Sequence, residues 1–159
     1  MTHAFVRAAF LGALAIASPL LAHAQKIDGL PVRPGNTVAE VQAAFNTDQA
    51  PVPSQSAVRR DTMALRLATA GVWVFFNKDG KSYTVRLDAP FQGSIGGVKI
   101  GSTQTQVIEA LGQPARIVQT AAVMGATLEP YVYFLDDGIS ARIDFDREAR
   151  VERFLLSKK

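Results

Sequence analysis

Residues 32–45 read VRPGNTVAEVQAAF, and residues 98–111, which begin 66 positions further on, read VKIGSTQTQVIEAL. A stretch that returns in this way indicates that one structural unit occurs twice in the chain. The positions that match suit a tight turn, a helix start and an apolar helix face, and they are Val32/Val98, Arg33/Lys99, Gly35/Gly101, Thr37/Thr103, Val41/Val107, Ala44/Ala110 and Phe45/Leu111. The repeat therefore bears on the fold and not on catalytic chemistry.

Each copy contains the start of a short amphipathic helix. Thr37 with Glu40, and Thr103 with Gln106, fit the capping box, in which the Thr hydroxyl and the Glu or Gln side chain each accept a hydrogen bond from the other residue's backbone amide. Apolar residues follow at helical spacing, namely Val38, Val41 and Phe45 in the first copy and Val107, Ala110 and Leu111 in the second. Gly112 is expected to end the second helix.

A hairpin pattern follows each helix. Apolar and alternating stretches on either side of turn residues predict strands at residues 72–76 and 82–88 in the first copy and at residues 131–135 and 139–145 in the second. Aligning Gly80 with Gly138 gives an offset of 58 instead of 66, so the first copy is expected to carry about eight additional residues, placed in the loop 48–56. A last strand is expected at residues 150–156.

These elements predict an α+β fold. Two tandem helix-plus-antiparallel-meander units, at about residues 30–90 and 96–157, are expected to form a single domain over residues 25–159. The helices would pack on one face of an antiparallel sheet. The other sheet face would then be left open to solvent or to a partner.

Residues 1–24 have the features of a secretory signal peptide. Arg7 precedes an apolar run at residues 8–21, and Ala22-His23-Ala24 forms an A-x-A cleavage site. The alternative is a membrane anchor, but about 14 apolar residues interrupted by Pro19 are shorter than the roughly 20 that a membrane span needs. The chain has no cysteine to carry a lipid anchor. We therefore expect a periplasmic or secreted protein without a membrane span.

Composition excludes several classes of function for the processed chain. Without Arg7, 16 of the 17 basic side chains remain against 14 acidic ones, and no long basic run is present, so nucleic acid is not an expected partner. His3 and His23 both lie in the signal segment and there is no cysteine. Catalytic triads, histidine bases and zinc sites built on His or Cys are thereby excluded. We expect no catalytic residues, no metal and no cofactor.

Acidic residues offer one alternative to that expectation. Asp144 and Asp146 share a strand face, and Asp136-Asp137 lie in the preceding turn. Carboxylates can bind Ca²⁺ or act as acid and base. The residues also fit solvated strand positions and ordinary turn chemistry, and no complete Ca²⁺ loop pattern is present.

Several short motifs in the second half resemble a known superfamily. They are the run Gly101-Ser-Thr-Gln-Thr-Gln-Val107, Leu111-Gly-Gln-Pro114, Tyr133-Phe134 with Asp137-Gly138, and Arg150-Val151 before a last apolar strand. In these residues the chain is similar to the superfamily of BamE-like envelope lipoproteins and the secreted β-lactamase inhibitor protein (BLIP). The resemblance implies a helical segment paired with a short antiparallel sheet, present in tandem as in the inhibitor.

Four aromatic residues are candidate contacts for a partner. If the two hairpins superpose, Trp73, Phe75, Tyr131 and Tyr133 share one side of the sheet, either the open face or the core. We predict a non-catalytic protein-binding module, inhibitor-like or accessory, that binds another envelope or secreted protein through these residues and the loop 48–60. The first alternative is an outer-membrane assembly or cell-envelope scaffold of the BamE type. The second is a hydrolase that uses carboxylates alone.

Overall fold

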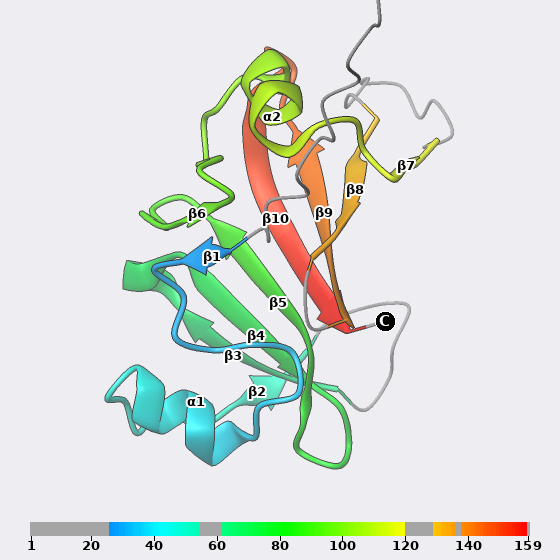
Figure 1. The fold of residues 1–159 in the computed structure, drawn as a ribbon. Helices are drawn as coiled ribbons and strands as arrows, with labels where there is room; N and C mark the ends of the chain where they lie inside the picture. The colour runs from blue at the N-terminus through cyan, green and yellow to red at the C-terminus, as the bar shows by residue number, and fades with distance from the viewer. Residues whose placement is uncertain (1–25, 55–61, 120–128, 136–137, 159) are drawn as a thin grey trace, which may run out of the picture.

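The computed structural model describes residues 26–54, 62–119, 129–135 and 138–158, and Figure 1 shows how its elements are arranged. The main feature is an eight-stranded antiparallel sheet with the strand order β2-β3-β4-β5-β10-β9-β8-β7. Its strands are β2 (Val52–Pro53), β3 (Met63–Leu67), β4 (Val72–Phe76), β5 (Ser82–Asp88), β7 (Arg116–Ile117), β8 (Tyr131–Phe134), β9 (Ile139–Phe145) and β10 (Val151–Lys158). The other elements are α1 (Val38–Ala44), α2 (Gln104–Leu111), the 3-10 turn η1 (Ala68–Ala70) and a small ribbon of β1 (Ile27–Asp28) with β6 (Ser94–Ile95).

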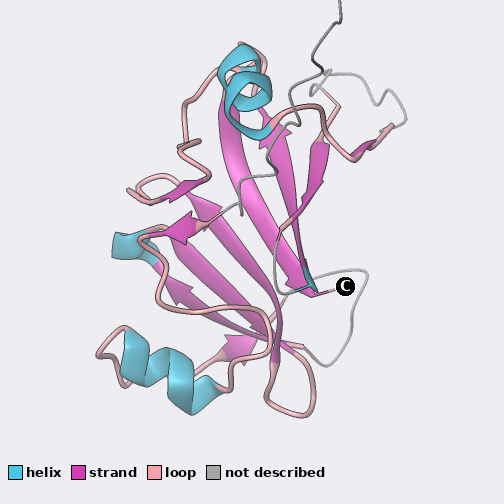
Figure 2. Cartoon of the chain, viewed as in Figure 1, coloured by secondary structure: helices cyan, strands magenta, loops and turns pink. Residues whose placement is uncertain are grey.

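The predicted fold class is wrong. The protein is not two helix-plus-meander units side by side, because its strands form one continuous sheet that dominates the structure, as Figure 2 shows. The two α-helices contain only seven and eight residues. The sheet is continuous because β5 and β10 pair with each other over residues 84–88 and 153–157. This pairing satisfies two strand edges that separate meanders would have left exposed.

The two predicted helix starts are confirmed. Thr37 Oγ1 accepts a hydrogen bond from the Glu40 amide at 3.3 Å, and the Glu40 carboxylate accepts one from the Thr37 amide at 2.7 Å. This amide, with the side chains of Thr37 and Asn36, holds the pKa of Glu40 below its usual value. Thr103 and Gln106 make the equivalent pair of bonds at 3.2 and 2.9 Å. Both helices therefore begin where the capping boxes place them.

Each helix start is tied to the start of a central strand. The Gly35 amide donates to the Ser82 carbonyl at 2.7 Å, and the Gly101 amide donates to the Val151 carbonyl at 2.8 Å. Ser82 and Val151 are the first residues of β5 and β10. The structural counterpart of β5 is thus β10, and not β9 as the alignment of Gly80 with Gly138 implied.

The turns before these two strands make the same correspondence. In the turn before β5, Asn77 Oδ1 accepts hydrogen bonds from the amides of Asp79 and Lys81, at 3.1 and 3.0 Å. In the turn before β10, Asp146 Oδ1 accepts hydrogen bonds from the amides of Glu148 and Arg150, at 3.0 and 2.9 Å. The left-handed position of the first turn is Gly80, with φ 70°, and that of the second is Ala149, with φ 59°. Because alanine stands where a glycine is expected, matching glycine to glycine shifted the alignment by one strand.

The predicted surplus of eight residues in the first copy is therefore also wrong. Ser82 and Val151 are 69 positions apart, whereas the helix starts are 66 apart, so the second half is the longer one, by three residues. The segment 48–54, expected to be loop, contains the edge strand β2. The predicted signal segment 1–24, Arg59-Arg60 and Asp136-Asp137 lie outside the described residues.

We expect Ala149→Gly to stabilise the protein by about 0.5–1 kcal/mol. A left-handed conformation costs an alanine about 1–2 kcal/mol, which exceeds the entropy that glycine loses on folding. The free energy of unfolding from urea denaturation measures the change. Gly80→Ala is the matched control and should lower stability, because it places an alanine in the same left-handed conformation. No atom lies within 4 Å of the added Cβ, so no steric clash adds to the effect. A wild type as stable as Ala149→Gly would contradict this account of the turn.

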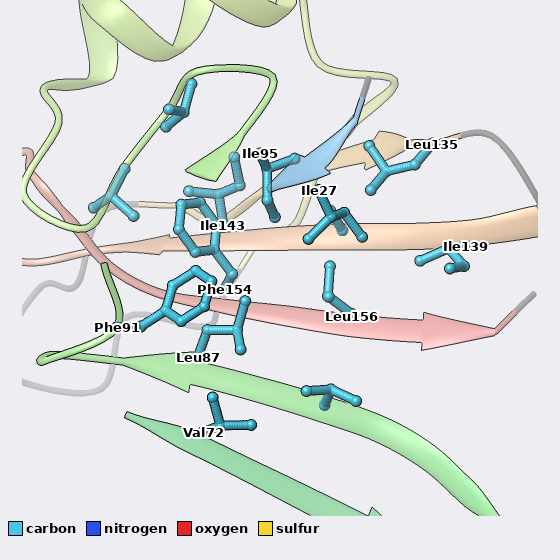
Figure 3. Packing of buried hydrophobic residues seen from close by; sticks show 14 of the residues in the cluster. Ile27, Val72, Leu87, Phe91, Ile95, Leu135, Ile139, Ile143, Phe154 and Leu156 are labelled. Atoms are coloured by element: carbon cyan, nitrogen blue, oxygen red, sulfur yellow. The ribbon is translucent and has the colours of Figure 1, made fainter. Parts of the chain in front are cut away.

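The core lies between the sheet and the segments that cover its inner face. Figure 3 shows Ile27 of β1 and Ile95 of β6 facing Ile143, Phe154 and Leu156 of the sheet. The helices contribute Val41 from α1, and Val107 and Leu111 from α2, to the same buried cluster. The helices and the β1–β6 ribbon thus pack on one side of the sheet, which leaves its opposite side as the place to look for a site.

Candidate functional site

The candidate site is the outer face of the sheet, formed by the side chains that alternate with the core residues along each strand. By register it comprises Val52, Ala64, Arg66, Trp73, Phe75, Thr84, Arg86, Asp88, Arg116, Val132, Phe134, Ser140, Arg142, Asp144, Arg153, Leu155 and Ser157. Most of these side chains are half-buried, Ala64 and Val132 are buried, and Val52, Arg66, Arg116 and Phe134 are exposed. The outer face is a mixed surface of aromatic, aliphatic, hydroxyl and arginine groups.

The structure separates the four aromatic residues predicted to act together. Trp73 and Phe75 are half-buried on the outer face, where their rings stack with centroids 6.5 Å apart. Tyr131 and Tyr133 are only 9% and 3% exposed and belong to the core cluster. The prediction that all four share one side is wrong, because the strand that corresponds to β4 is β9, and Trp73 therefore matches Arg142 on the outer face.

Trp73 lies between two arginine side chains. Its direct cross-strand neighbours are Arg66 on β3 and Arg86 on β5. The guanidinium carbon of Arg66 is 4.5 Å from the indole centroid, and that of Arg86 is 5.3 Å away. Each cation–π contact contributes about 0.5–1 kcal/mol at an exposed site. The three side chains therefore hold one another in place on the surface.

Arg86 and a further arginine, Arg142, are each oriented by an aspartate two residues along the same strand. Arg86 binds Asp88 through Nε at 3.0 Å and through Nη2 at 2.8 Å. Arg142 binds Asp144 through Nε at 2.6 Å. The two Arg-x-Asp pairs restrict the guanidinium groups, and the aspartates do not engage Nη1 of Arg86 or the terminal nitrogens of Arg142. Sequence reasoning missed this motif, although RLD at 86–88 and RID at 142–144 are visible in the sequence.

Arg153 occupies the space between the two pairs. Its cross-strand neighbours on the two sides are Asp88 and Asp144, and its Nε lies 4.0 Å from Asp144 Oδ2. Its Nη2 binds Glu152 at 2.8 Å, whereas the buried Nε has no hydrogen-bond partner among the described residues. Asp88 and Asp144 are thus neutralised by arginines, which leaves neither carboxylate free for acid–base chemistry.

A hollow of about 340 Å³ opens on the half of the outer face nearer to β7. It is lined by Thr84, Arg116, Val118, Val132, Ser140, Arg142, Leu155 and Ser157. Thr84 Oγ1 and Ser157 Oγ form a hydrogen bond of 3.1 Å, and the Ser140 hydroxyl donates to the Ser157 carbonyl at 3.2 Å. The hollow therefore offers hydroxyl groups beside two guanidinium groups and a small apolar floor.

Comparison with known proteins supports the fold. One solved structure, a DUF4309 family protein (YjgB) from Bacillus subtilis, is similar with a TM-score of 0.53 and 18% identity, and the match covers 81% of this chain and 82% of that one. No protein-family model and no curated protein matches the sequence. At this identity the likeness concerns the arrangement of the chain alone.

Other sequence-level candidates have structural roles where the structure describes them. Asp144 is held by Arg142, and Asp146 binds the amides of its turn, so the two carboxylates are engaged separately. Among the described residues, no group of three or more Asp, Glu, His or Cys side chains is placed to hold a metal ion. In the same part of the chain, no helix is long and apolar enough to cross a membrane.

Tyr133 ties β8 to the end of α2. Its hydroxyl donates to the Gly112 carbonyl at 3.0 Å. Burial raises the pKa of Tyr133 to about 12, and Tyr131 adds a smaller effect in the same direction. Between pH 10 and about 12, the unfolded chain therefore loses a proton that the folded protein keeps, and stability falls as the pH rises.

We expect Tyr133→Phe to reduce this alkaline loss of stability. At neutral pH the variant should be less stable by about 1 kcal/mol, because it lacks one hydrogen bond. From about pH 10 to about pH 12 its free energy of unfolding should fall less than that of the wild type, because phenylalanine cannot ionise. Urea denaturation over this range measures both. Parallel curves for the two proteins would show that Tyr133 does not contribute to the pH dependence.

Proposed function

We propose that this chain is a non-catalytic protein-binding module of the cell envelope, periplasmic or secreted, that binds another protein through the outer face of its sheet. The observation that carries the proposal is Trp73, half-buried on that face between Arg66 and Arg86. Tryptophan and arginine are among the residues most enriched at the energetic centres of protein interfaces. Side chains already fixed by mutual contacts lose less entropy when a partner binds.

The size of the outer face also supports a protein partner. Neighbouring strands lie about 4.8 Å apart, so the seven strands from β3 to β7 span about 29 Å. A typical interface buries about 800 Å² on each partner, which a surface of this width and a few residues in depth provides. The surface combines exposed apolar groups with arginines, as interface cores do.

The proposed periplasmic or secreted location is inferred from residues 1–24, whose sequence predicts a signal peptide. The resemblance to the BamE-like and BLIP-like superfamily supports a binding role in the same compartment. Tyr131 and Tyr133 are not part of the proposed surface, since both are buried in the core.

The test begins with capture of a partner from the source organism's envelope extract on the immobilised chain, followed by titration of the purified partner. Trp73→Ala is expected to weaken binding about 30-fold, the loss typical of a residue at the centre of an interface. Ile117→Ala is the matched control and should bind nearly as the wild type does, because Ile117 is 47% exposed but pairs with the core residue Tyr131 and so lies off the outer face. Circular dichroism confirms that both variants fold. A partner that binds Trp73→Ala as tightly as the wild type would overturn the proposal.

A further inference from the structure

Seven residues form one continuous row across the outer face. Each is the direct cross-strand neighbour of the next, and the row crosses β3, β4, β5, β10, β9, β8 and β7. In that order, the residues of this arginine row are Arg66, Trp73, Arg86, Leu155, Arg142, Val132 and Arg116. Arginine and apolar side chains therefore alternate from strand to strand over the whole width of the row.

The alternation sets a spacing between the charges. With strands about 4.8 Å apart, arginines on every second strand lie about 10 Å apart, with an apolar side chain midway between each pair. The acidic residues of the outer face, Asp88 and Asp144, lie outside the row, on either side of Arg153. The outer face carries five arginines against these two aspartates. The arginine row is therefore a line of excess positive charge.

The four arginines of the row fall into two groups by their capacity to bind a carboxylate of a partner. Among the described residues, Arg66 and Arg116 have no carboxylate within ion-pair distance. Asp88 binds Arg86 through Nε and Nη2, and Asp144 binds Arg142 through Nε, so each aspartate occupies one edge of the guanidinium group. A guanidinium held at one edge can still donate to a second carboxylate from its terminal nitrogens.

We propose that the partner presents an acidic amphipathic helix that lies along the arginine row; this inference rests on the function proposed above. Helix residues seven apart are about 10.5 Å apart on one face, and those three or four apart lie about 5 Å along the axis, which matches the alternation of arginine and apolar side chains. An extended strand presents side chains on one side about every 6.8 Å and does not match it. Carboxylates at the heptad positions bind the arginines, and apolar residues between them contact Trp73 and Leu155, which are half-buried, whereas Val132 is only 5% exposed.

The test uses three labelled helical peptides of about 21 residues, which place either Glu, Gln or Lys at three positions of a heptad spacing and leucine between them. Fluorescence anisotropy measures their binding to the full chain. The Glu peptide is expected to bind at least tenfold more tightly than the Gln peptide, and the Lys peptide should not bind. Binding of the Glu peptide should weaken as salt rises from about 50 to about 300 mM.

Variants then locate the binding on the row. Arg66→Gln and Arg116→Gln, which break no ion pair among the described residues, should each weaken the Glu peptide about five- to tenfold. Lys78→Gln removes the same charge from the exposed turn before β5 and should leave binding unchanged. If Lys78→Gln weakened binding of the Glu peptide as much as the arginine variants do, the peptide would be bound by general charge attraction, and the inference would be overturned. A non-helical acidic peptide that binds as tightly as the helical one would also overturn it.

Failure of the inference is distinguishable from failure of the proposed function. If the Glu and Gln peptides bind equally and both are lost in Trp73→Ala, the outer face binds protein without selecting acidic segments, and only the inference fails. If no peptide binds but the captured partner depends on Trp73, the inference also fails alone. If neither the peptides nor any captured partner depends on Trp73, both fail together.

Discussion

Phe154→Ala is expected to lower the free energy of unfolding by about 3–5 kcal/mol, the range for removing a buried phenylalanine side chain. Phe154 is 0% exposed and lies on β10, the strand that joins the two halves of the sheet. Its cross-strand neighbours are Leu87 on β5 and Ile143 on β9, which are also fully buried. The cavity left by the ring would therefore open where both halves meet, and neither half can move into it without breaking strand pairs.

The neighbouring residue of the same strand is the matched control. Leu155 points to the outer face and is half-buried, so Leu155→Ala should cost about 1 kcal/mol or less. Urea denaturation followed by circular dichroism measures both variants. An equal loss at the two positions would show that the inner and outer faces of β10 are assigned incorrectly, and with them the outer face itself.

Gly71→Ala is expected to destabilise the protein by about 3 kcal/mol or more, through overpacking against backbone atoms that cannot rotate away. Gly71 has φ 65° and lies between η1 and β4. A Cβ at this position would overlap the Asp88 carbonyl oxygen and the backbone nitrogens of Pro90 and Phe91. The Gly71 carbonyl also accepts the Asp88 amide at 2.9 Å, so any shift disturbs the end of β5.

Gly80→Ala separates the two causes of this loss. Gly80 has a nearly identical φ of 70°, but no atom lies within 4 Å of its added Cβ. It should therefore show only the net cost of replacing glycine by alanine in a left-handed conformation, about 0.5–1 kcal/mol, the size expected for the reverse exchange at position 149. Thermal or urea unfolding of the two variants gives the difference directly. Equal losses would mean that the close approach of Asp88 and Phe91 to Gly71 is relieved without cost.

The helix starts could be predicted because their causes are local. Thr37 with Glu40, and Thr103 with Gln106, satisfy backbone amides within four residues, so the spacing alone identifies them. Pairing of β5 with β10 could not be predicted in the same way, because it joins residues about 70 positions apart. The alignment was wrong because of one residue. Ala149 adopts the left-handed conformation that Gly80 has in the other half, but the sequence alignment paired Gly80 with Gly138.

The same shift explains why only half of the candidate site was predicted. Trp73 and Phe75 lie on the outer face, but the alignment added Tyr131 and Tyr133, which are core residues, and omitted the arginines. Arg86 and Arg142 are spaced like ordinary solvated strand residues, and only the register shows that they lie in one line with Trp73. Side chains on separate strands form a site through strand order, which a single sequence does not record.

The position of β10 has a consequence for biosynthesis. This strand follows all the other described strands in the sequence, yet it stands between β5 and β9 in the middle of the sheet. While a ribosome is still adding residues before Val151, the first four strands of the sheet have no partner at their inner edge, and the hydrophobic core lacks Phe154 and Leu156. Contacts between such distant segments form slowly and late. The sheet therefore stays incomplete until β10, which ends at Lys158, is available to pair with β5 and β9.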